Sequence, residues 1–437
     1  MTLQLTTRRI AVAVAVVLVC VLYLADLSGM GLVSKDEPRY ADIGRAMAHT
    51  GDWITPRLWG HPWLEKPPLL YWLIGAGFQS GFGPEVAPRL PVALLSLAFL
   101  WFFHDRIRKI WDRRVADFST AILATAAGWL AYSHVAVTDI PMAACFSVAV
   151  LFAVSSAERA RSSEHVLAAG ALALAVLGKS LVPLVLFVPV VAVDYRHLRE
   201  WLRPAPVAAF LVIALPWHIL CAMRNGTELW NVLFVQQQFG RFFSPERQHV
   251  QPWWFYLPVL LLLLFPWFPL LAVVDRDWRD RRTRLLGTVV IFGFLFFSKS
   301  VNKLPGYLLP LLPSVCILIG HGLARTKRVG LAMIAPATLL GAIPVAAHVL
   351  PYALATGLRS RPLPWSELAM WSVVAVVAAT ILALFLKQRS FPVVAAAAAA
   401  LCIALQFAAF PAIDRAVSAR SLWRERHPSC VPSPDRA

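Results

Sequence analysis

The chain has 437 residues, of which 59% are hydrophobic and only 15% are charged. Together with a mean hydropathy of +0.64, this composition excludes an ordinary soluble globular domain and is typical of a polytopic membrane protein. The formal net charge of +17 could suggest a nucleic-acid partner, but an excess of Lys and Arg in a membrane protein normally reflects loops that face the cytoplasm.

Apolar runs recur along the whole chain. A helix needs roughly 20 apolar residues to cross the hydrocarbon core, and helices are the only open-ended structures that satisfy their backbone there. We therefore expect an all-α membrane domain over residues 1–410 with about 13 spans. Residues 411–437 would be a short polar tail without a separate soluble domain. The expected spans are 9–27, 86–103, 115–133, 140–157, 165–178, 180–194, 205–222, 253–274, 285–298, 306–323, 330–350, 366–386 and 391–410.

The short basic connectors between these spans all fall on one side when the amino terminus is placed inside. Because the positive-inside rule applies to short loops, they predict a cytoplasmic amino terminus. The outer face, periplasmic in a bacterium, then receives residues 28–85 and the loop 223–252. The side of the tail depends on whether the Ala-rich run near 395–400 crosses. The basic connectors are 104–114, 158–165, 194–203, 275–284, 324–328 and 387–389.

Residues 34–68 form a polar stretch that cannot lie in lipid, and we expect a folded outer loop with short interfacial helices. Asp36 and Glu37 are adjacent carboxylates, and Glu65 and Lys66 precede a proline pair. A carboxylate at a helix start is often only a solvated cap, because helix amino termini favour acidic residues. Charged residues on several outer loops favour a shared site instead.

Asp139 and Lys179 lie in short turns between apolar runs. An ionisable residue at membrane depth costs roughly 2.5 to 3.5 kcal/mol on insertion scales, so Asp139 is expected to face a cavity or a partner. Gly178 and Lys179 lack the earlier glycine of a phosphate-binding loop, because residue 173 is Ala173, and no nucleotide site is predicted. Lys179 could hold a lipid-linked phosphate or could snorkel to the surface.

His249, Lys303 and Tyr307 lie on two later outer loops. A single His is usually a polar loop residue, but His249 could bind a metal if Glu65 came close to it. Lys303 and Tyr307 add a cation and a phenol to the same face.

Five motifs along the chain resemble those of the bacterial aminoarabinose transferase and protein O-mannosyltransferase superfamily, whose members have the GT-C fold. They occur in the family's order, and the first two are the most specific. The motifs are Asp36-Glu-Pro-Arg-Tyr, Glu65-Lys-Pro-Pro-Leu-Leu-Tyr, Thr138-Asp-Ile-Pro, His249 before Pro-Trp-Trp, and Lys303-Leu-Pro-Gly-Tyr-Leu-Leu-Pro.

The resemblance implies that Asp36 and Asp139 are catalytic carboxylates and that Glu65 and His249 bind a divalent metal, namely zinc. Aminoarabinose transferases carry an additional soluble outer domain, which leaves the sugar and the acceptor open for this chain. The residues expected to contact the phosphate of a polyprenyl-phosphate donor are Lys66, Lys179, Tyr307, Lys303 and Arg39.

The function implied is transfer of a sugar from undecaprenyl phosphate to an envelope acceptor, by a single inverting displacement on the periplasmic side of the inner membrane. Lipid A, with an aminoarabinose-type sugar, is the expected acceptor, and a protein hydroxyl is the alternative. A lipid or glycolipid transporter would place its polar site near the bilayer midplane and often shows internal repeats. Here the ionisable residues cluster in loops on one side, and no repeat is visible.

Overall fold

The computed structural model describes residues 2–159, 162–240, 249–341, 343 and 385–417. In this part of the chain nearly every ordered element is a helix, which confirms the all-α class. The α-helices are α1 (Thr2–Leu24), α2 (Asp36–Thr50), α3 (Leu69–Gln79), α4 (Val86–Ile110), α5 (Arg113–Thr125), α6 (Ala127–Ser133), α7 (Asp139–Arg159), α8 (Ser162–Lys179), α9 (Val182–Val193), α10 (Leu198–Trp201), α11 (Pro204–Asn225), α12 (Thr227–Trp230), α14 (Tyr256–Leu263), α15 (Arg281–Lys299), α16 (Leu312–Arg325) and α19 (Ser390–Val417).

Shorter elements connect these helices. The strands β1 (Arg57–Leu58) and β2 (His61–Pro62) form an antiparallel pair, and η2 (Asn231–Gly240) is a π-helix. The 3-10 helices are η1 (Tyr195–His197), η3 (Trp253–Phe255), η4 (Phe268–Val273), η5 (Pro305–Leu311) and η6 (Lys387–Arg389).

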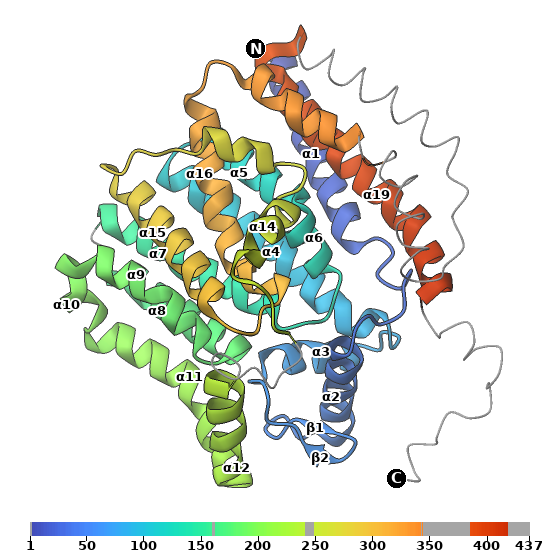
Figure 1. Ribbon diagram of the computed structural model, residues 1–437, viewed down its shortest axis with the longest axis vertical. Coiled ribbons are helices and arrows are strands. Elements are labelled where there is room, and N and C mark those ends of the chain that lie inside the picture. The colour runs from blue at the N-terminus through green and yellow to red at the C-terminus, as the bar shows by residue number, and fades with distance from the viewer. Residues whose placement is uncertain (1, 160–161, 241–248, 342, 344–384, 418–437) are drawn as a thin grey trace.

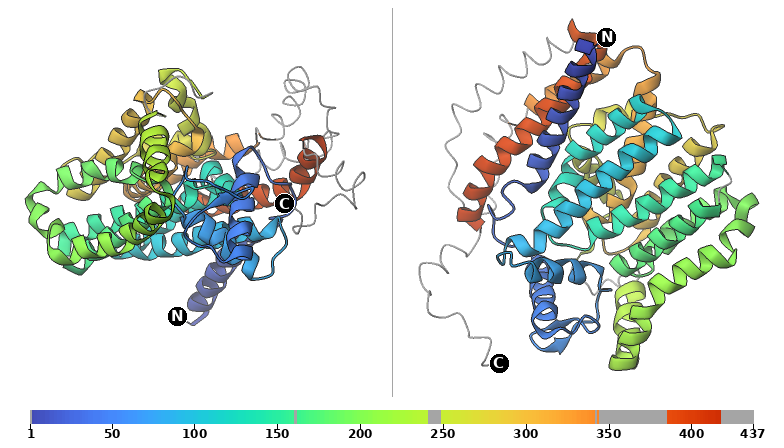
Figure 2. Two further views of the ribbon diagram at one scale, coloured as in Figure 1. Left: turned by 90° about the horizontal axis from the view of Figure 1, so that it is seen from below. Right: turned by 180° about the vertical axis from the view of Figure 1, so that it is seen from behind.

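The long helices form a bundle, and a smaller outer layer covers one end of it. Figure 1 and the right-hand view of Figure 2 show α2, α3 and the strand pair together at the lower end of the bundle, on the same side as α12. We call residues 34–68, with the helix α3 that follows them, the outer layer. The predicted loop on the outer face is therefore a folded unit resting on the ends of the helices.

The expected count of about 13 full spans is not confirmed in the part of the chain that the structure describes. Among the described residues, five helices are long and apolar enough to cross a membrane, or six if α5 and α6, bent by 59°, count as one span. The expected span 253–274 is divided between α14 and η4, and α9 has only 12 residues. Apolar runs in this bundle thus form short or broken helices as well as full spans. Part of 330–350 and nearly all of 366–386 lie outside the described residues.

The last helix, α19, runs beside α1 along the edge of the bundle (Figure 1). Near its start, Phe391 packs edge-on against Phe118, with ring centroids 4.6 Å apart. Near its end, Asp414 accepts a hydrogen bond of 2.8 Å from the backbone N–H of Gly31, which follows α1. The Ala-rich run therefore extends along the bundle, and the helix ends at Val417, later than the expected boundary at residue 410.

The outer layer has its own packed interior. Ile43, Leu70 and Ile74 have no exposed surface, and the packing of α2 against α3 depends on the small residue at Gly44. A Cβ added there would lie 2.4 Å from Cγ2 of Ile74. The short helices were expected. The strand pair was not, because its two-residue turn is Trp59-Gly60, with φ of 53° and 83°, rather than a familiar Asn-Gly pair.

Candidate active site

Asp139 and Lys179 form an ion pair where α7 and α8 meet. Asp139 begins α7 and Lys179 ends α8, so that each charge complements the dipole of its own helix. The two helices pack closely at this end, because a Cβ added at Gly178 would lie 3.2 Å from Cα of Met142. Nζ of Lys179 donates to Oδ1 of Asp139 at 2.7 Å, and the side chains are only 12% and 15% exposed. Asp139 therefore has a partner in Lys179, as expected for an ionisable residue whose burial in a membrane protein is energetically costly.

Tyr307 completes this group, which we call the Asp139 cluster (Asp139, Lys179 and Tyr307). The ammonium of Lys179 lies 4.7 Å from the centre of the Tyr307 ring, within cation–π distance. The preceding residue, Gly306, leaves no room for a side chain, because an added Cβ would lie 2.5 Å from Oδ1 of Asp139. The 3-10 turn of η5 thus brings its backbone directly against the carboxylate. Three segments far apart in the chain converge here.

The two adjacent carboxylates of α2 have different surroundings. Glu37 is fully buried and accepts two hydrogen bonds from Arg89, at 2.7 Å from Nε and 2.8 Å from Nη2. It also accepts from the backbone N–H groups of Val33 at 2.6 Å and Ala136 at 2.9 Å. A bidentate, fully hydrogen-bonded pair is the arrangement in which burial of two charges is tolerated. We call Glu37 and Arg89 the buried clamp.

The buried clamp joins the outer layer to the bundle. Arg89 belongs to α4, and its remaining N–H groups donate to the backbone carbonyls of Leu27, Met30 and Gly31. Ala136 lies three residues before Asp139. The Glu37–Arg89 pair therefore holds together the start of α2, the segment between α1 and α2, and the turn before Asp139.

Asp36 lies beside the clamp but is not part of it. Its side chain is 49% exposed, and it forms an ion pair with Arg39, with Nη1 3.8 Å from Oδ1. Arg39 in turn stacks over Trp63 at 5.6 Å from the ring centre. The carboxylate is therefore about half exposed and accessible to a ligand.

Glu65 and Lys66 contact the same part of the outer layer. Burial raises the pKa of the Tyr71 phenol, and the charges of Tyr40, Glu65 and Asp36 raise it further. The charges of both carboxylates therefore act on one buried phenol. Lys66 is 7% exposed, and its ammonium donates to the carbonyl of Glu65 at 3.3 Å and to Oε1 of Gln237 at 3.5 Å.

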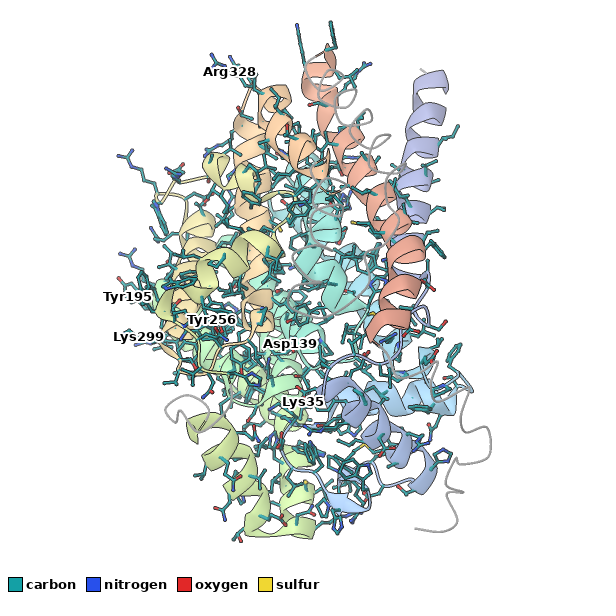
Figure 3. The ribbon with its side chains drawn as sticks, turned by 45° about the vertical axis from the view of Figure 1, so that its right-hand side comes forward. Lys35, Asp139, Tyr195, Tyr256, Lys299 and Arg328 are labelled. Atoms are coloured by element: carbon teal, nitrogen blue, oxygen red, sulfur yellow. The ribbon has the colours of Figure 1, made fainter. Side chains whose placement is uncertain are left out.

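The outer layer packs through apolar side chains against α8, the helix that ends at Lys179. Leu64, next to Glu65, belongs to a buried cluster that includes Leu177, two residues before Lys179. In Figure 3, Asp139 lies at the end of the bundle that adjoins the outer layer, and Arg328 lies at the opposite end. The site residues expected from the sequence, on the outer layer and on α7, α8 and η5, therefore lie at the same end of the molecule.

Lys303 and His249 are placed differently from the expectation. The ammonium of Lys303 is buried and donates to the carbonyls of Gln251 and Ser300, and its backbone N–H donates to the carbonyl of His249 at 3.0 Å. Lys303 thus ties one outer loop to another. The His249 side chain is exposed.

The metal ligands expected from the sequence do not form a complete site on their own. Among the described residues, no three His, Cys, Asp or Glu side chains come together in a way that could hold a metal ion. The charge of Glu65 acts on the Tyr71 phenol, while the His249 side chain is exposed. Glu65 and His249 would supply two ligands, so a zinc ion here would also need oxygens of the substrate or water, and we derive no catalytic step through a metal.

Sequence reasoning identified the Asp139 cluster residue by residue but assigned no role to Arg89, Gly306 or Gln237. Arg89 could have been noticed, because an ionisable residue at the start of an apolar run needs a partner. Gly306 and Gln237 carry no comparable signal. Their contacts depend on how distant segments pack.

Comparisons with known proteins agree with this arrangement. The family model for dolichyl-phosphate-mannose-protein mannosyltransferases matches residues 65–220. The undecaprenyl phosphate-alpha-4-amino-4-deoxy-L-arabinose arabinosyl transferase of Pseudomonas aeruginosa is 32% identical over 328 residues, covering 70% of this chain and 58% of the relative. The protein of the same name from Pseudomonas savastanoi is 32% identical over 69% of this chain and 59% of its own length. The chain thus spans less than two thirds of the length of these curated relatives.

Solved structures show the same similarity in three dimensions. The crystal structure of ArnT from Cupriavidus metallidurans bound to undecaprenyl phosphate superposes with a TM-score of 0.79 and 28% identity, over 93% of this chain and 77% of that chain. The arabinosyltransferase EmbB from Mycobacterium smegmatis shares the fold alone, with a TM-score of 0.52 and 12% identity over 92% of this chain and 41% of that chain.

Proposed function

Because this chain belongs to the GT-C superfamily of bacterial aminoarabinose transferases and protein O-mannosyltransferases, we propose that it is a polyprenyl-phosphate-sugar-dependent glycosyltransferase. The protein is a multi-pass membrane protein. In the proposal it lies in the bacterial inner membrane, with a cytoplasmic amino terminus and a periplasmic active site. The donor is a sugar on undecaprenyl phosphate, and the acceptor is lipid A, which receives an aminoarabinose-type sugar.

The observation that carries the proposal is the Asp139 cluster at the end of the bundle under the outer layer. Lys179 is 12% exposed, held by Asp139 at 2.7 Å and stacked on Tyr307 at 4.7 Å. A fixed cation in a site that excludes most water stabilises developing negative charge more strongly than one in bulk solvent. The phosphate of a lipid-linked sugar is the group that gains such charge.

The reaction is a single displacement at the anomeric carbon. An acceptor oxygen forms a bond to that carbon while the bond to the donor phosphate oxygen breaks, and the electron pair leaves with the polyprenyl phosphate. In this proposal Lys179 and Lys66 bind the departing phosphate, and Tyr307 donates a hydrogen bond to it. Attack from the opposite face inverts the anomeric configuration.

Asp36 acts on the acceptor side of the proposed site. Its carboxylate is half exposed and does not pair with Arg89, because Glu37 forms the ion pair of the buried clamp instead. If the acceptor is a phosphate of lipid A, the nucleophile is already an anion, and Asp36 orients it. If the acceptor is a hydroxyl, Asp36 takes its proton as a general base.

The metal stays a prediction of the sequence. A divalent ion, expected to be zinc, would be held by Glu65 and His249 with oxygens of the substrate, and when bound it would polarise the phosphate. The proposed displacement is complete without it.

The experiment that tests the proposal uses the purified chain in detergent with undecaprenyl phosphate carrying a radiolabelled sugar and with lipid A. We expect label in lipid A and a loss of roughly 100-fold or more in rate for Asp36→Asn and for Asp139→Asn. The matched control is Asp42→Asn, which removes a carboxylate of the same helix α2 that pairs with Arg45 at 2.7 Å on the surface. Full sugar transfer by both test variants would refute the assignment of the site.

A protein acceptor is the second candidate. The family model matched over residues 65–220 describes protein mannosyltransferases. In membranes incubated with labelled lipid-linked sugar, label that migrates with protein rather than with lipid would favour this acceptor and refute lipid A.

A further inference from the structure

A cavity of about 420 Å³ lies where the end of α9 meets the start of α15, away from the Asp139 cluster. Its walls come from the end of α9, from η1 and from the start of α15. Because α9 starts three residues after Lys179 and α15 leads toward Tyr307, the cavity is separated from the Asp139 cluster by the length of these two helices. The lining residues are Val193, Tyr195, Arg196, His197, Arg281 and Arg284.

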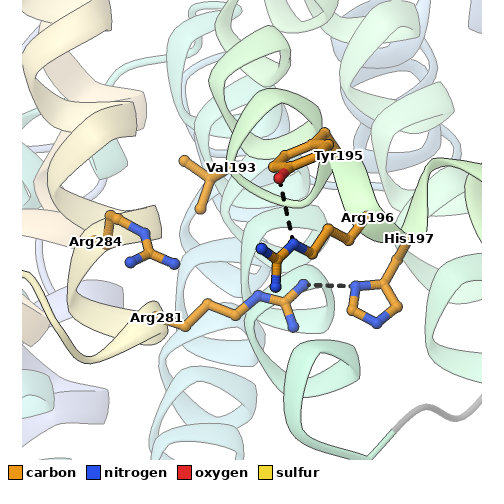
Figure 4. A pocket seen from close by; sticks show the side chains of 6 residues that line it. All are labelled: Val193, Tyr195, Arg196, His197, Arg281 and Arg284. Carbon is orange, nitrogen blue, oxygen red and sulfur yellow. Dashed lines mark hydrogen bonds between the residues drawn. The ribbon is translucent and has the colours of Figure 1, made fainter.

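The cavity is strongly basic. Figure 4 shows the guanidinium groups of Arg196, Arg281 and Arg284 directed toward one opening. Arg281 is paired with the buried carboxylate of Asp194, which also accepts from Trp201. Burial lowers the pKa of Arg281, and the positive charge of Arg284 lowers it further, so the two cations are close. None of the lining residues is acidic.

Arg196 and Arg284 have only neutral partners within the described part of the chain. Arg196 donates to the phenol oxygen of Tyr195 at 3.3 Å, as Figure 4 shows, and Arg284 donates to the carbonyl of Trp278 at 3.4 Å. Neither forms an ion pair with a carboxylate there. Two uncompensated guanidinium groups beside one compensated by Asp194 make a site for an anion, and their planar N–H groups match the oxygens of a phosphate.

The surface that leads away from the cavity is apolar. On α15, Arg284 is followed on the same helical face by Thr288 and then by Ile291 and Leu295, which are 50% and 56% exposed. At about 1.5 Å per residue, Arg284 to Leu295 covers roughly 16 Å, about half of the ~30 Å hydrocarbon core. On the neighbouring helix α9, Val188 is 55% exposed. The protein surface thus places a cationic cavity next to an apolar stripe about as long as one leaflet is deep. This combination matches the anionic headgroup and the acyl chain of a phospholipid.

We propose that this cavity binds the phosphate of an anionic phospholipid whose acyl chain lies along Ile291 and Leu295. The site is distinct from the proposed active site and does not depend on the proposed glycosyltransferase reaction. The lipid phosphate bridges Arg196 of η1 and Arg284 of α15, and it thereby fastens the connector after α9 to the start of α15. Basic cavities between transmembrane helices commonly bind anionic headgroups in this way.

The test measures lipid retention by the purified full chain, using native mass spectrometry with phosphatidylglycerol and, separately, phosphatidylcholine. We expect the Arg196→Gln/Arg284→Gln variant to retain about tenfold less phosphatidylglycerol, the loss expected when two charge-assisted contacts are removed. The control Lys327→Gln/Arg328→Gln removes the same charge from exposed residues just beyond α16, outside the cavity. An equal fall in both variants, or equal retention of the two lipids by the unmodified chain, would overturn the proposal.

Two further arms identify the source of the phosphate and guard against misfolding. Inorganic phosphate should not displace phosphatidylglycerol, because it lacks the acyl chains that contact α15. Displacement would show a site for free phosphate and overturn the lipid assignment. The Arg196→Lys/Arg284→Lys variant keeps the charge and loses the planar fork, so its retention should fall between those of the Gln variant and the unmodified chain. Retention as low as that of the Gln variant would contradict a role for the positive charges.

Discussion

The Asp139 cluster and the outer layer contain the same kinds of charged residues in different surroundings. In the cluster, a carboxylate and an ammonium are paired at 2.7 Å with little exposure, at the ends of two helices of the bundle. In the outer layer, Asp36 is about half exposed and 3.8 Å from Arg39. In the proposed reaction, the bundle would fix the cation that meets the donor phosphate, and the layer would present a carboxylate to the acceptor. The buried clamp of Glu37 and Arg89 holds the two regions in register.

The largest effect is expected from breaking the clamp. Glu37→Ala leaves the guanidinium of Arg89 buried without a carboxylate, which costs about 3 to 5 kcal/mol, so thermal unfolding in detergent should occur at a much lower temperature. In a double-mutant cycle, Glu37→Ala/Arg89→Met should recover part of the loss. Equal stability of Glu37→Ala and the unmodified chain would show that the layer is held by other contacts.

The next effect tests the cluster itself. Lys179→Ala removes the fixed cation and should slow sugar transfer by roughly 100- to 1,000-fold, as loss of a preorganised charge stabiliser does. Lys179→Arg, measured beside it, should retain more activity because it keeps the charge. If Lys299→Ala, an exposed lysine at the end of α15, slowed transfer equally, the special position of Lys179 would be refuted.

A smaller effect is expected at Gly306. In Gly306→Ala, the added Cβ would lie 2.5 Å from Asp139 Oδ1 and 2.9 Å from Tyr132 Cε1, so the carboxylate or the turn must shift and the geometry of the ion pair with Lys179 should change. Since displacements of about 1 Å can cost up to 100-fold in rate, we expect a loss of roughly tenfold. Gly83→Ala, whose Cβ would meet no atom within 4 Å, serves as the control and should transfer sugar normally.

The smallest effect concerns the attachment of the outer layer to α11 and appears only in acid. Asp52 accepts from Arg224 at 2.8 Å. Burial raises its pKa, but the N–H groups of Thr55 and Ile54 and then the charge of Arg224 outweigh this, and the net pKa is lowered. The stability that Asp52 contributes is therefore full above its unfolded pKa of about 3.9 and is lost as the pH falls through the lower folded value.

Thermal unfolding measured from about pH 6 down to pH 3 should show this loss in the unmodified chain and a shallower decline in Asp52→Asn. Asp42→Asn, on the surface of α2, should decline like the unmodified chain. Identical profiles for all three would mean that Asp52 does not anchor the layer.

The candidate site could be predicted largely from its residue types. Asp139 and Lys179 stood out because charged residues beside apolar runs are costly and need a partner or a function, and Tyr307 stood out as the phenol of a family motif. The structure brings these three together from α7, α8 and η5, although they are separated by 40 residues or more along the chain. For Lys303, the same reasoning identified an unusual residue, but its ammonium contacts backbone carbonyls of neighbouring loops. A charged residue in an apolar sequence therefore predicts that its side chain has an interaction partner, but it does not identify that partner.

The sequence by itself determined the membrane class, the helical fold and the side on which the polar residues gather, because hydrophobic length and charge bias act locally along the chain. Only the tertiary structure decided which of two adjacent carboxylates is buried. Asp36 and Glu37 are chemically almost equivalent, and the difference arises because Glu37 points toward Arg89 and the N–H of Ala136 from other segments. Those contacts depend on how the helices pack.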